Sequence, residues 1–556
     1  MVQTIMKKTI FTFYFSLFTF VMLSVVEASA QVWKPLSPLL YATSEPAEVY
    51  TLKVYNNKLL IYGNIMRIGN YMLPQPQFGS WGRPLTWDGI VYDSIPGLGN
   101  FYGVIYSFAE FNNKLYCGGN FNKINNDIGV GNIPNTKYIA RFDGTNMEAL
   151  SNITPSNDVK ILKTKNYLYV AGYFYFLGST VYGPVAGYNG TNYSHLGVGV
   201  QGTNPAVYAM TEYNNEIIIS GGIDWVGGLY TNGIAAWSGT VWHKLKDEYL
   251  VTPNNMVVDT INNFLYVSSQ EYGTDTTSGL KRWDGYNWDD LHIPDTNSYP
   301  FKLCMYHKEL FASLLVVELN QDTILLRYDG VSWYNIIGLN SDVRDMCVYN
   351  DDLYIAGYFN MAGADSVNGI VALHVEPPTG CNWLIPRVFA NSDTFYLGGG
   401  NANVQLYNNN AYAQSWQWNF GDSGTDNVKD PIHSYTIAGN YTAIVTVTDS
   451  GCVKTAQKTI TILNGNGLEE YTKEKLNFKV YPNPTTGNIT VECTIPGKDK
   501  SELRAFSSYG SLQEAYSLQP GYNKVEIPAG KWDSGVSIVG LYVNGKQILA
   551  EKVVKN

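Results

Sequence analysis

The 556-residue sequence has few charged side chains, few histidines and few cysteines. Charged residues make up 15% of the chain and the formal net charge is −10, which argues against nucleic acid or an anionic membrane as a partner. The 6 histidines are scattered, and no His-x-x-x-His pair, Ser-His-Asp order or Gly-rich phosphate loop stands out. We therefore expect no catalytic residue, no metal site and no cofactor.

Long apolar runs are also missing, except near the N-terminus. Lys7-Lys8 precedes an apolar run over 10–26, and Ala28-Ser29-Ala30 follows it. This pattern predicts a secretory signal peptide over residues 1–30, with a membrane anchor as the alternative. No other stretch approaches the roughly 18 apolar residues that a spanning helix needs, so the mature protein is expected to have no transmembrane segment.

The 6 cysteines receive separate interpretations, and none of their spacings is that of a zinc site. Cys381 and Cys452 flank one predicted domain of an exported chain and are expected to form a disulfide. A bond between Cys304 and Cys347 stays open, because it requires neighbouring repeats to approach within about 7 Å at Cα. The remaining two cysteines are expected to pack as small apolar residues.

Aromatic residues and glycine are abundant, with Tyr 43, Trp 13 and Gly 53, as suits strands joined by tight turns. One phrase, a strand, a polar two-residue turn and a second strand, recurs seven times at intervals that shorten from 56 to 43 residues. Its markers, the first apolar residues after each turn, are Leu59, Leu115, Leu168, Ile217, Leu265, Leu310 and Leu353. A period of this length is typical of propeller blades with four strands each.

A second phrase, an aromatic residue followed by a turn that ends in glycine, alternates with the first. Its six turns are Asp88-Gly89, Asp143-Gly144, Asn189-Gly190, Ser238-Gly239, Asp284-Gly285 and Asp329-Gly330. Asp-Gly and Asn-Gly supply the positive φ angles of tight hairpins, so each phrase predicts two further antiparallel strands.

Seven first phrases but only six second phrases leave one outer strand missing. The last repeat runs into Pro377-Pro378, which cannot continue a strand. Residues 32–36 match the missing strand in pattern and are expected to pair with the last repeat. The prediction for residues 31–376 is a seven-bladed β-propeller, within an all-β protein.

The repeats are similar to the kelch repeats of galactose-oxidase-like propellers. Such enzymes need a Tyr crosslinked to a Cys and two His at a copper centre. Tyr116 and Cys117 are adjacent, and neighbouring strand residues point to opposite faces, so these two cannot form that link with each other. A copper oxidase is therefore disfavoured.

Residues 379–463 differ in style from the repeats. Trp416-Gln417-Trp418-Asn419-Phe420-Gly421-Asp422 is followed by His433-Ser434-Tyr435 and Gly439-Asn440-Tyr441. These motifs resemble a PKD domain, an immunoglobulin-like β-sandwich that serves as a spacer or adhesion module; the family's Asp is here Asn419, and Ser423 is inserted before Gly424. We expect a spacer, with Trp418 and Tyr435 in its core and Asp422 holding a turn.

A Gly-rich linker at 464–475 leads to a last unit at 476–556, a second small β-sandwich. The motif residues are Tyr481, Pro482, Asn483, Pro484 and Gly487, with Gly545, Lys546 and Lys552 near the end. They resemble the type A sorting domain of the Bacteroidetes type IX secretion system, although Ser537 and Gly540 depart from it. The resemblance implies export through that machinery, cleavage by its sortase, and release or attachment outside the cell.

The expected function is a secreted or cell-surface, non-catalytic binding or adhesion protein whose propeller face binds a glycan or a protein. Loop aromatics Trp225, Tyr175 and Phe176 are candidate ligand contacts, although they could instead pack between blades. One alternative is a polysaccharide hydrolase or lyase, which needs converging carboxylates. Another is a structural surface protein without a specific ligand.

Overall fold

The computed structural model describes residues 31–42, 45–73, 82–125, 132–150, 155–177, 180–181, 183–201, 205–246, 253–269, 279–294, 298–316, 324–397, 400–464, 476–495, 500–507, 512–532, 534–543 and 546–555. The expected signal peptide and nearly all of the expected linker lie outside these residues. Strands form almost all of the regular structure, and the helix among the described residues is the three-residue 3₁₀ helix η1 (Ala529–Lys531). The fold class is all-β, as the sequence predicts.

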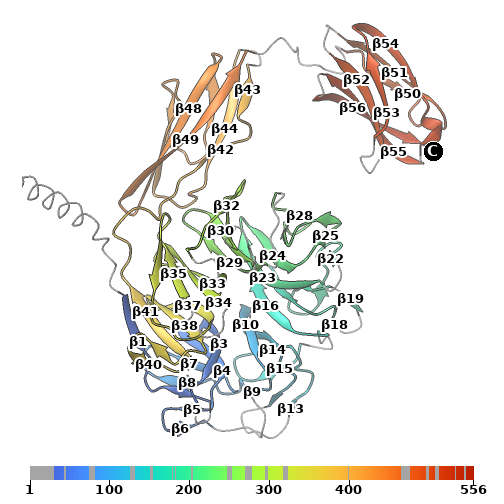
Figure 1. Ribbon diagram of the computed structural model, residues 1–556. Helices are drawn as coiled ribbons and strands as arrows, with labels where there is room; N and C mark the ends of the chain where they lie inside the picture. The colour runs from blue at the N-terminus through green and yellow to red at the C-terminus, as the bar shows by residue number, and fades with distance from the viewer. Residues whose placement is uncertain are drawn as a thin grey trace, which may run out of the picture. The chain divides into compact units, whose positions relative to one another are not determined.

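Residues 31–375, here called the seven-sheet region, contain seven four-stranded antiparallel sheets (Figure 1). The first three are β3 (Glu48–Tyr55), β4 (Lys58–Asn64), β7 (Leu85–Trp87), β8 (Tyr92–Ser94); β10 (Ile105–Phe111), β11 (Lys114–Gly119), β14 (Ile139–Phe142), β15 (Met147–Glu148); and β16 (Val159–Thr164), β17 (Leu168–Gly172), β20 (Val185–Tyr188), β21 (Tyr193–Ser194). The next three are β23 (Ala206–Tyr213), β24 (Glu216–Gly222), β27 (Ile234–Trp237), β28 (Trp242–His243); β29 (Pro253–Asp259), β30 (Phe264–Ser269), β31 (Leu280–Trp283), β32 (Trp288–Asp290); and β33 (Ser298–Tyr306), β34 (Glu309–Val316), β35 (Ile324–Tyr328), β36 (Trp333–Ile336).

The seventh sheet takes its outer strand from the other end of the region. It consists of β37 (Val343–Tyr349), β38 (Asp352–Gly357), β41 (Ile370–Val375) and β1 (Gln31–Pro35). β1 lies antiparallel to β41, with Trp33 opposite Leu373. The Lys34 Nζ atom lies 2.7 Å from an Asp352 carboxylate oxygen in the neighbouring strand. The strand thus begins and ends one residue earlier than the range 32–36 suggested by the sequence.

Both kinds of turn have the local geometry that their sequences demand. Five first hairpins turn through two residues with positive φ, as in a type I′ turn: Asn56-Asn57, Asn112-Asn113, Asn214-Asn215, His307-Lys308 and Asn350-Asp351. In all six second hairpins, the side chain before the glycine accepts hydrogen bonds from the backbone N–H groups two and three residues later. First and second hairpins turn at the same end of the sheets, here called the turn end.

The register pairs the two repeated phrases with each other. The marker residue of each first phrase lies directly opposite the aromatic residue of the second, as Leu59 opposite Trp87 and Ile217 opposite Trp237 illustrate. The same register holds in the other four complete repeats. The aromatic ring then packs on the next strand, with Trp237 and Trp242 centroids 5.1 Å apart. Cross-strand pairs of this kind stabilise a sheet and fix its register.

Successive sheets bury their faces against each other. Seven apolar clusters among the described residues each combine two sheets, in the order first with second through sixth with seventh. The remaining cluster joins the seventh sheet to the first, with Ala356 and Ala372 packed beside Leu59 and Ile61. The first strands contact one another in the same order, and β37 contacts β3; Figure 1 shows these strands gathered about one centre.

Short strands occupy the connections at the opposite end from the turns. They are β2 (Leu40–Tyr41), β5 (Arg67–Ile68), β6 (Tyr71–Met72), β9 (Asn100–Phe101), β12 (Ile124–Asn125), β13 (Asn132–Ile133), β18 (Phe176–Leu177), β19 (Thr180–Val181), β22 (Val200–Gln201), β25 (Trp225–Val226), β26 (Leu229–Tyr230), β39 (Met361–Ala362) and β40 (Asp365–Ser366). Several form small hairpins between the second and third strands of a sheet. The repeats therefore differ in length mainly through the connections at this end.

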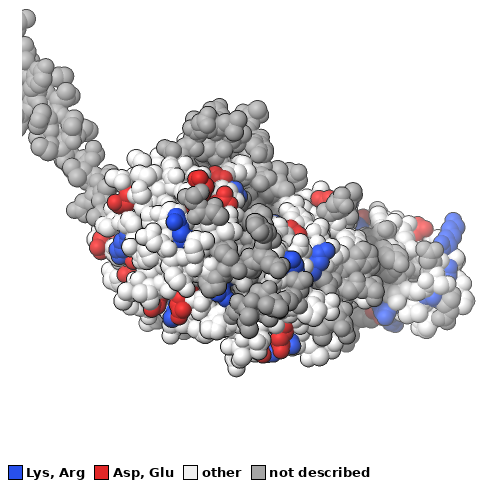
Figure 2. Space-filling model, turned by 90° about the horizontal axis from the view of Figure 1, so that it is seen from below, with Lys and Arg blue, Asp and Glu red and all other residues white. Residues whose placement is uncertain are grey.

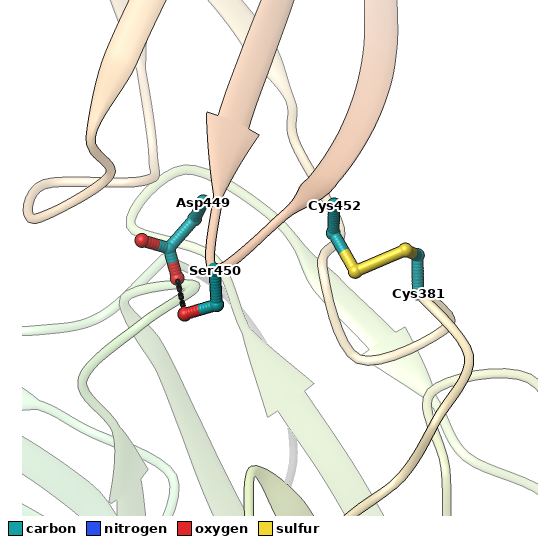
Figure 3. The surroundings of a disulfide bond; sticks show 4 residues. All are labelled: Cys381, Asp449, Ser450 and Cys452. Carbon is teal, nitrogen blue, oxygen red and sulfur yellow. Dashed lines mark hydrogen bonds between the residues drawn. A yellow bond between two sulfur atoms is a disulfide. The ribbon is translucent and has the colours of Figure 1, made fainter.

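The following segment forms two sheets. One contains β42 (Val388–Ala390), β44 (Ala402–Asn408) and β47 (Ile432–Tyr435); the other contains β43 (Thr394–Tyr396), β49 (Cys452–Leu463), β48 (Gly439–Asp449), β45 (Ser415–Asn419) and β46 (Thr425–Asp426). Trp418 and Tyr435 are fully buried, and Asp422 Oδ1 accepts a hydrogen bond from the Gly424 N–H. Figure 3 shows the disulfide between Cys381 and Cys452, beside the Ser450 hydroxyl that donates to Asp449.

The chain divides into two compact units, residues 1–393 with 404–433 and 441–460, and residues 394–403 and 434–440 with 461–556. Within the first unit, the turn end is hydrogen-bonded to residues around 376–410. Asn262 Nδ2 donates to the Trp383 carbonyl, and Asn262 Oδ1 accepts from Ile385 N and Asn410 Nδ2. Asn262 is buried. Its hydrogen bonds join the repeats to residues that follow them within the first unit.

The last segment forms a sheet of β50 (Lys479–Tyr481), β51 (Ile489–Ile495) and β54 (Gly521–Ile527), and a sheet of β52 (Ser501–Ser507), β53 (Leu512–Leu518), β55 (Gly535–Val543) and β56 (Lys546–Lys555). A single apolar cluster lies between them, with Ile489, Val491, Leu503 and Val539 fully buried. The alternating burial along β51 is that of a strand with one face in a core.

Candidate functional site

Each of the seven first strands carries a β-bulge at the same place, near its start. The bulged residue has no partner in the pairing with the second strand. These seven bulge residues are Tyr50, Tyr106, Lys160, Tyr208, Asn254, Phe301 and Arg344. Because a bulge re-aims a side chain, it can turn one residue per sheet toward a common space. The end that carries them, opposite the turn end, is here called the bulge end.

A repeated glycine accommodates the bulge. Near the ends of five second strands, a Cβ atom on the glycine would lie within 2.3 Å of a carbonyl oxygen at the start of the bulged strand or just before it, as at Gly63, Gly119, Gly172, Gly221 and Gly357. Only a residue without a side chain permits this close approach of two backbones. The glycine that closes most of the first phrases is therefore a requirement of the bulge.

The bulge residues line one central cavity of about 800 Å³. The residues that follow the bulges, among them Thr51, Ser107, Asn255 and Asp345, form a second layer of the lining. Tyr173 and Tyr358, which follow second strands, contribute two further rings. The cavity has the size of a small-molecule site and draws residues from all seven sheets.

Cationic groups and aromatic rings lie against each other around this cavity. Lys160 Nζ lies 3.3 Å from the Tyr106 ring centroid and 5.2 Å from that of Tyr173. The Arg344 guanidinium lies 4.3 Å from the Tyr358 centroid. Burial, opposed by the nearby Asp158 carboxylate, lowers the pKa of Lys160 to about 8, so this ammonium is charged at neutral pH.

The second layer holds neighbouring sheets together. Thr51 Oγ1 donates to the Ile105 carbonyl, and Asn255 Oδ1 accepts from Leu303 N at 3.0 Å. Asp345 of the seventh sheet accepts from Leu52 N of the first at 2.8 Å. Burial raises the pKa of Asp345, against the opposing effects of Lys302 and the backbone donors. These side chains are therefore committed to the fold.

Two of the bulge residues, in contrast, have a hydrogen-bond donor without an acceptor among the described residues. Asn254 Nδ2 and Arg344 Nε are buried atoms without an acceptor among the described residues. Asn254 Oδ1 accepts from the Ser268 hydroxyl at 2.6 Å, and Arg344 Nη2 donates to Asp342 at 3.1 Å, so both side chains are held in place. A buried donor without an acceptor costs free energy and usually signals function, a bound water or a ligand.

The loop aromatics predicted from the sequence lie at the bulge end but are not among the lining residues. Trp225 is 45% exposed, with its ring centroid 5.4 Å from that of Tyr230, and Tyr175 is 41% exposed. Phe176 begins β18, and its side chain lies outside the description. The hydrolase or lyase alternative needs converging carboxylates near loop ends, for which the sequence offers Asp224, Asp275 and Asp365: Asp365 is in the exposed β40, Asp224 is exposed, and Asp275 lies outside the described residues.

The two cysteine pairs considered from the sequence differ in the structure. Cys381 and Cys452 are bonded, whereas Cys304 and Cys347 are free thiols on the first strands of adjacent sheets. Tyr116 and its neighbour Cys117 belong to different apolar clusters, on opposite faces of β11. No group of His, Cys, Asp and Glu able to hold a metal ion occurs within the described ranges.

The motif residues of the last unit converge on its final strand. Asn483 Nδ2 donates to the Lys552 carbonyl at 2.5 Å, and Asn483 Oδ1 accepts from Val554 N at 2.9 Å. Thr485 N donates to the Val554 carbonyl, and Gly487 N donates to Thr485 Oγ1. Tyr481, the last residue of β50, donates a hydrogen bond from its OH group to Glu492 in β51. Gly545 and the Lys546 side chain lie outside the description.

Sequence reasoning missed the bulge residues, although a signal was present. In five repeats the bulge residue stands nine positions before the marker: Tyr50, Tyr106, Tyr208, Phe301 and Arg344. When the repeats are aligned, this position is aromatic in four of the five. The bulge that turns these side chains inward has no sequence signature of its own.

On the face visible in Figure 2, basic and acidic side chains lie interspersed among uncharged ones. Among the described residues no helix is long and apolar enough to span a membrane. The cavity is thus the place where cations, rings and unused donors come together.

Residues 400–463 match the family model of the PKD domain. The chain therefore contains a PKD domain, within the range 379–463 predicted from the sequence. PKD domains are typical of extracellular proteins.

Solved structures similar to the chain include one titled "Crystal Structure of Mitotic Checkpoint Complex", at 10% identity and a TM-score of 0.36, covering 62% of this chain and 94% of that one. A second concerns carbohydrate-binding modules of the β-sandwich superfamily, at 14% identity and a TM-score of 0.13, covering 30% and 94%. A third contains fibronectin(III)-like modules of Clostridium thermocellum CbhA, at 11% identity and a TM-score of 0.16, covering 30% and 92%. These scores leave the function to be argued from the site.

Proposed function

We propose that this chain is a secreted or surface-displayed, non-catalytic binding protein that holds a glycan at the bulge end of a seven-bladed, kelch-like β-propeller. The observation that carries the proposal is the central cavity, to which all seven first strands contribute a bulged side chain. Support for the propeller comes from the seven four-stranded sheets, from β1 as outer strand of the last, and from the apolar cluster between the seventh and first sheets.

Glycan binding is favoured over binding of a folded protein partner. A cavity of about 800 Å³ admits a small molecule or a chain end, but not a protein surface. Tyrosine supplies an apolar ring face and a hydroxyl, which suits the alternating apolar and hydroxyl surfaces of a sugar. Tyr50, Tyr106, Tyr173, Tyr208 and Tyr358 all belong to the lining.

The non-catalytic part of the proposal rests on the carboxylates. Glycoside hydrolysis requires a pair of carboxyl groups about 5–10 Å apart around the scissile bond. Asp345 is the carboxylate among the lining residues, and its oxygens accept from the backbone N–H groups of Leu52 and Met346. A residue engaged in this way is a structural element of the cavity.

Export through the type IX system of a Bacteroidetes bacterium is the second part of the proposal, with residues 1–30 as signal peptide and 476–556 as sorting domain. The hydrogen bonds of Asn483 with the backbone of Lys552 and Val554 support it, because they tie the opening motif to the basic final strand. We expect Asn483→Ala to accumulate inside a type IX-competent host, with Asn523→Ala of the same unit secreted normally. Equal secretion of both variants would reject this role.

The test of the binding function is a glycan-array and polysaccharide pull-down screen on the full chain, with released reducing sugar assayed in parallel. The expected result is saturable binding without sugar release. Release of sugar would establish the hydrolase or lyase alternative. Absence of any glycan binding would reject the proposal in favour of a structural role or a protein partner.

A further inference from the structure

The lining of the central cavity contains more basic than acidic side chains. It contains three basic side chains, Lys160, Lys302 and Arg344, and one carboxyl group, that of Asp345. The carboxylate oxygens of Asp345 already accept hydrogen bonds from two backbone N–H groups. The cavity therefore presents more positive charge than its own lining neutralises.

Three acidic residues just outside the lining, Asp342, Glu48 and Asp158, equal its three basic side chains in number, and each interacts with a lining side chain. Arg344 Nη2 lies 3.1 Å from Asp342 Oδ2, and the pair is about one-third exposed, as expected for a weak ion pair at a rim. The Glu48 carboxylate accepts from Tyr50 OH at 2.6 Å, and Asp158 acts on Lys160 through space. Lys302 has no ion-pair partner within the part of the chain that the structure describes, and its Nζ atom lies 5.9 Å from the Phe301 ring centroid.

The unused hydrogen-bond capacity points in the same direction. Both buried polar atoms without a partner in the described part of the lining, Asn254 Nδ2 and Arg344 Nε, are donors. An acceptor in the cavity reaches these two buried atoms only if their side chains shift, whereas the ammonium groups of Lys160 and Lys302 are donors on lining residues. Anionic oxygen atoms are the strongest acceptors, and they gain most where water is partly excluded.

The aromatic rings restrict the remainder of the ligand. Lys160 covers one face of Tyr106, and Arg344 covers Tyr358. The Tyr173 and Tyr208 rings meet edge to face at a centroid distance of 5.7 Å. Cations and rings therefore lie against each other around one cavity, which suits a ligand with an acidic substituent on a ring that can stack.

We propose that the central cavity recognises an anionic saccharide, whose carboxylate or sulfate binds between Lys160, Lys302 and Arg344 while its sugar rings contact the surrounding tyrosines. This inference rests on the proposed glycan binding and specifies the class of glycan. The two acidic groups share the required chemistry, negatively charged oxygen acceptors on a pyranose ring, and the experiment separates them.

The test is isothermal titration of the full chain with oligouronates of galacturonate, mannuronate and guluronate and with sulfated cello-oligosaccharides. Each is paired with its methyl-esterified or unsulfated counterpart, which keeps the size and removes the charge. At least one charged member should bind tenfold or more tighter than its counterpart. Raising the salt concentration should weaken this binding, because charge supplies it.

Variants assign the binding to the cavity. Lys160→Met and Arg344→Met should each lower the affinity for the charged saccharide about tenfold or more, as loss of a charge-assisted contact implies. Lys123→Met is the matched control, since Lys123 lies 3.8 Å from the Tyr102 ring centroid without belonging to the lining. Near-ultraviolet circular dichroism of all three variants verifies folding.

The outcomes distinguish this inference from the proposed function. Equal affinity for charged and neutral members of every pair would overturn the anionic preference and leave glycan binding intact. Loss of affinity in Lys123→Met equal to that in Lys160→Met would overturn the placement in the cavity. Tighter binding of a tetraglutamate peptide than of any saccharide would assign the site to an acidic peptide and reject both.

Discussion

The turn end and the bulge end of the seven sheets differ in how their side chains are used. At the turn end, the repeats carry nearly the same residues, and each Asp, Asn or Ser before a glycine accepts the same two backbone hydrogen bonds. At the bulge end, equivalent positions hold Tyr, Lys, Asn, Phe and Arg. Positions that a fold requires are repeated within the chain, whereas positions that face a ligand are free to differ.

The difference extends to the satisfaction of polar groups. Asn262 at the turn end is buried and uses both ends of its amide. Asn254, one strand earlier, keeps its buried Nδ2 atom without an acceptor among the described residues. Asparagine thus stabilises the turn end of this sheet through its hydrogen bonds, and at the bulge end it keeps a donor without an acceptor among the described residues.

Replacement of Asn262 by leucine should have the largest effect. Asn262→Leu leaves Ile385 N, Asn410 Nδ2 and the Trp383 carbonyl without their partner, which should lower the free energy of unfolding by about 3 kcal/mol. Chemical denaturation measures the change, and Asn335→Leu, at the exposed position of β36, is the control. A loss shared equally by the control would show that the buried amide has no special role.

Asp345 tests the contact between the last and first sheets at the bulge end. Asp345→Ala removes the acceptor of Leu52 N and should cost about 2 kcal/mol of unfolding free energy. Asp345→Asn keeps an acceptor oxygen and should retain most of that stability. If both variants unfold at the same denaturant concentration, the hydrogen bond does not join the sheets energetically.

Tyr208 separates binding from stability. Tyr208→Ala should weaken glycan affinity about tenfold, because stacked aromatic contacts contribute roughly 1 kcal/mol or more, and should change the unfolding transition little. Trp225→Ala, at the same end but outside the lining, is its counterpart in the titration. Greater loss of affinity in the Trp225 variant would favour the loop aromatics predicted from the sequence.

The pH dependence should be the smallest effect. Because burial lowers the pKa of Lys160 to about 8, its ammonium is charged below this pH and loses its proton above it. Affinity for an anionic saccharide should therefore fall a few-fold from pH 7 to pH 9. The groups facing Lys160 are Asp158, Lys302, Tyr106 and Tyr173, and burial raises the pKa values of both tyrosines away from this range.

The same titration with Lys160→Met provides the control for that pH effect. Without the ammonium, affinity should stay constant over the interval. A profile that keeps its slope in the variant would assign the titration to another group.

Much of the architecture can be predicted from the sequence, because it depends on interactions between residues that are close in the chain. Asn-Asn and Asp-Gly turns need positive φ, and the alternation of apolar residues fixes which face is buried. The PKD domain was predicted from Trp418, Tyr435 and their neighbours, and the family match confirms it. The type IX export route remains a prediction.

The candidate site was less accessible to sequence reasoning. Trp225 and Tyr175 were chosen because aromatic residues in loops are visible in a sequence, and the cavity is lined instead by residues within strands. An alternating pattern assigns Tyr50 or Arg344 to a strand face. Only the extra residue of the bulge, which depends on pairing with a second strand, turns it toward the centre.

The sequence by itself determined the repeats, their turns and the strand order within each sheet, because these depend on residues that are close in the chain. The tertiary structure decided which side chains share the central cavity and which donors remain unused there. Tyr50 and Arg344 are almost 300 positions apart, and no local pattern connects them. They meet because seven sheets pack face to face and each aims one bulged residue at the same space.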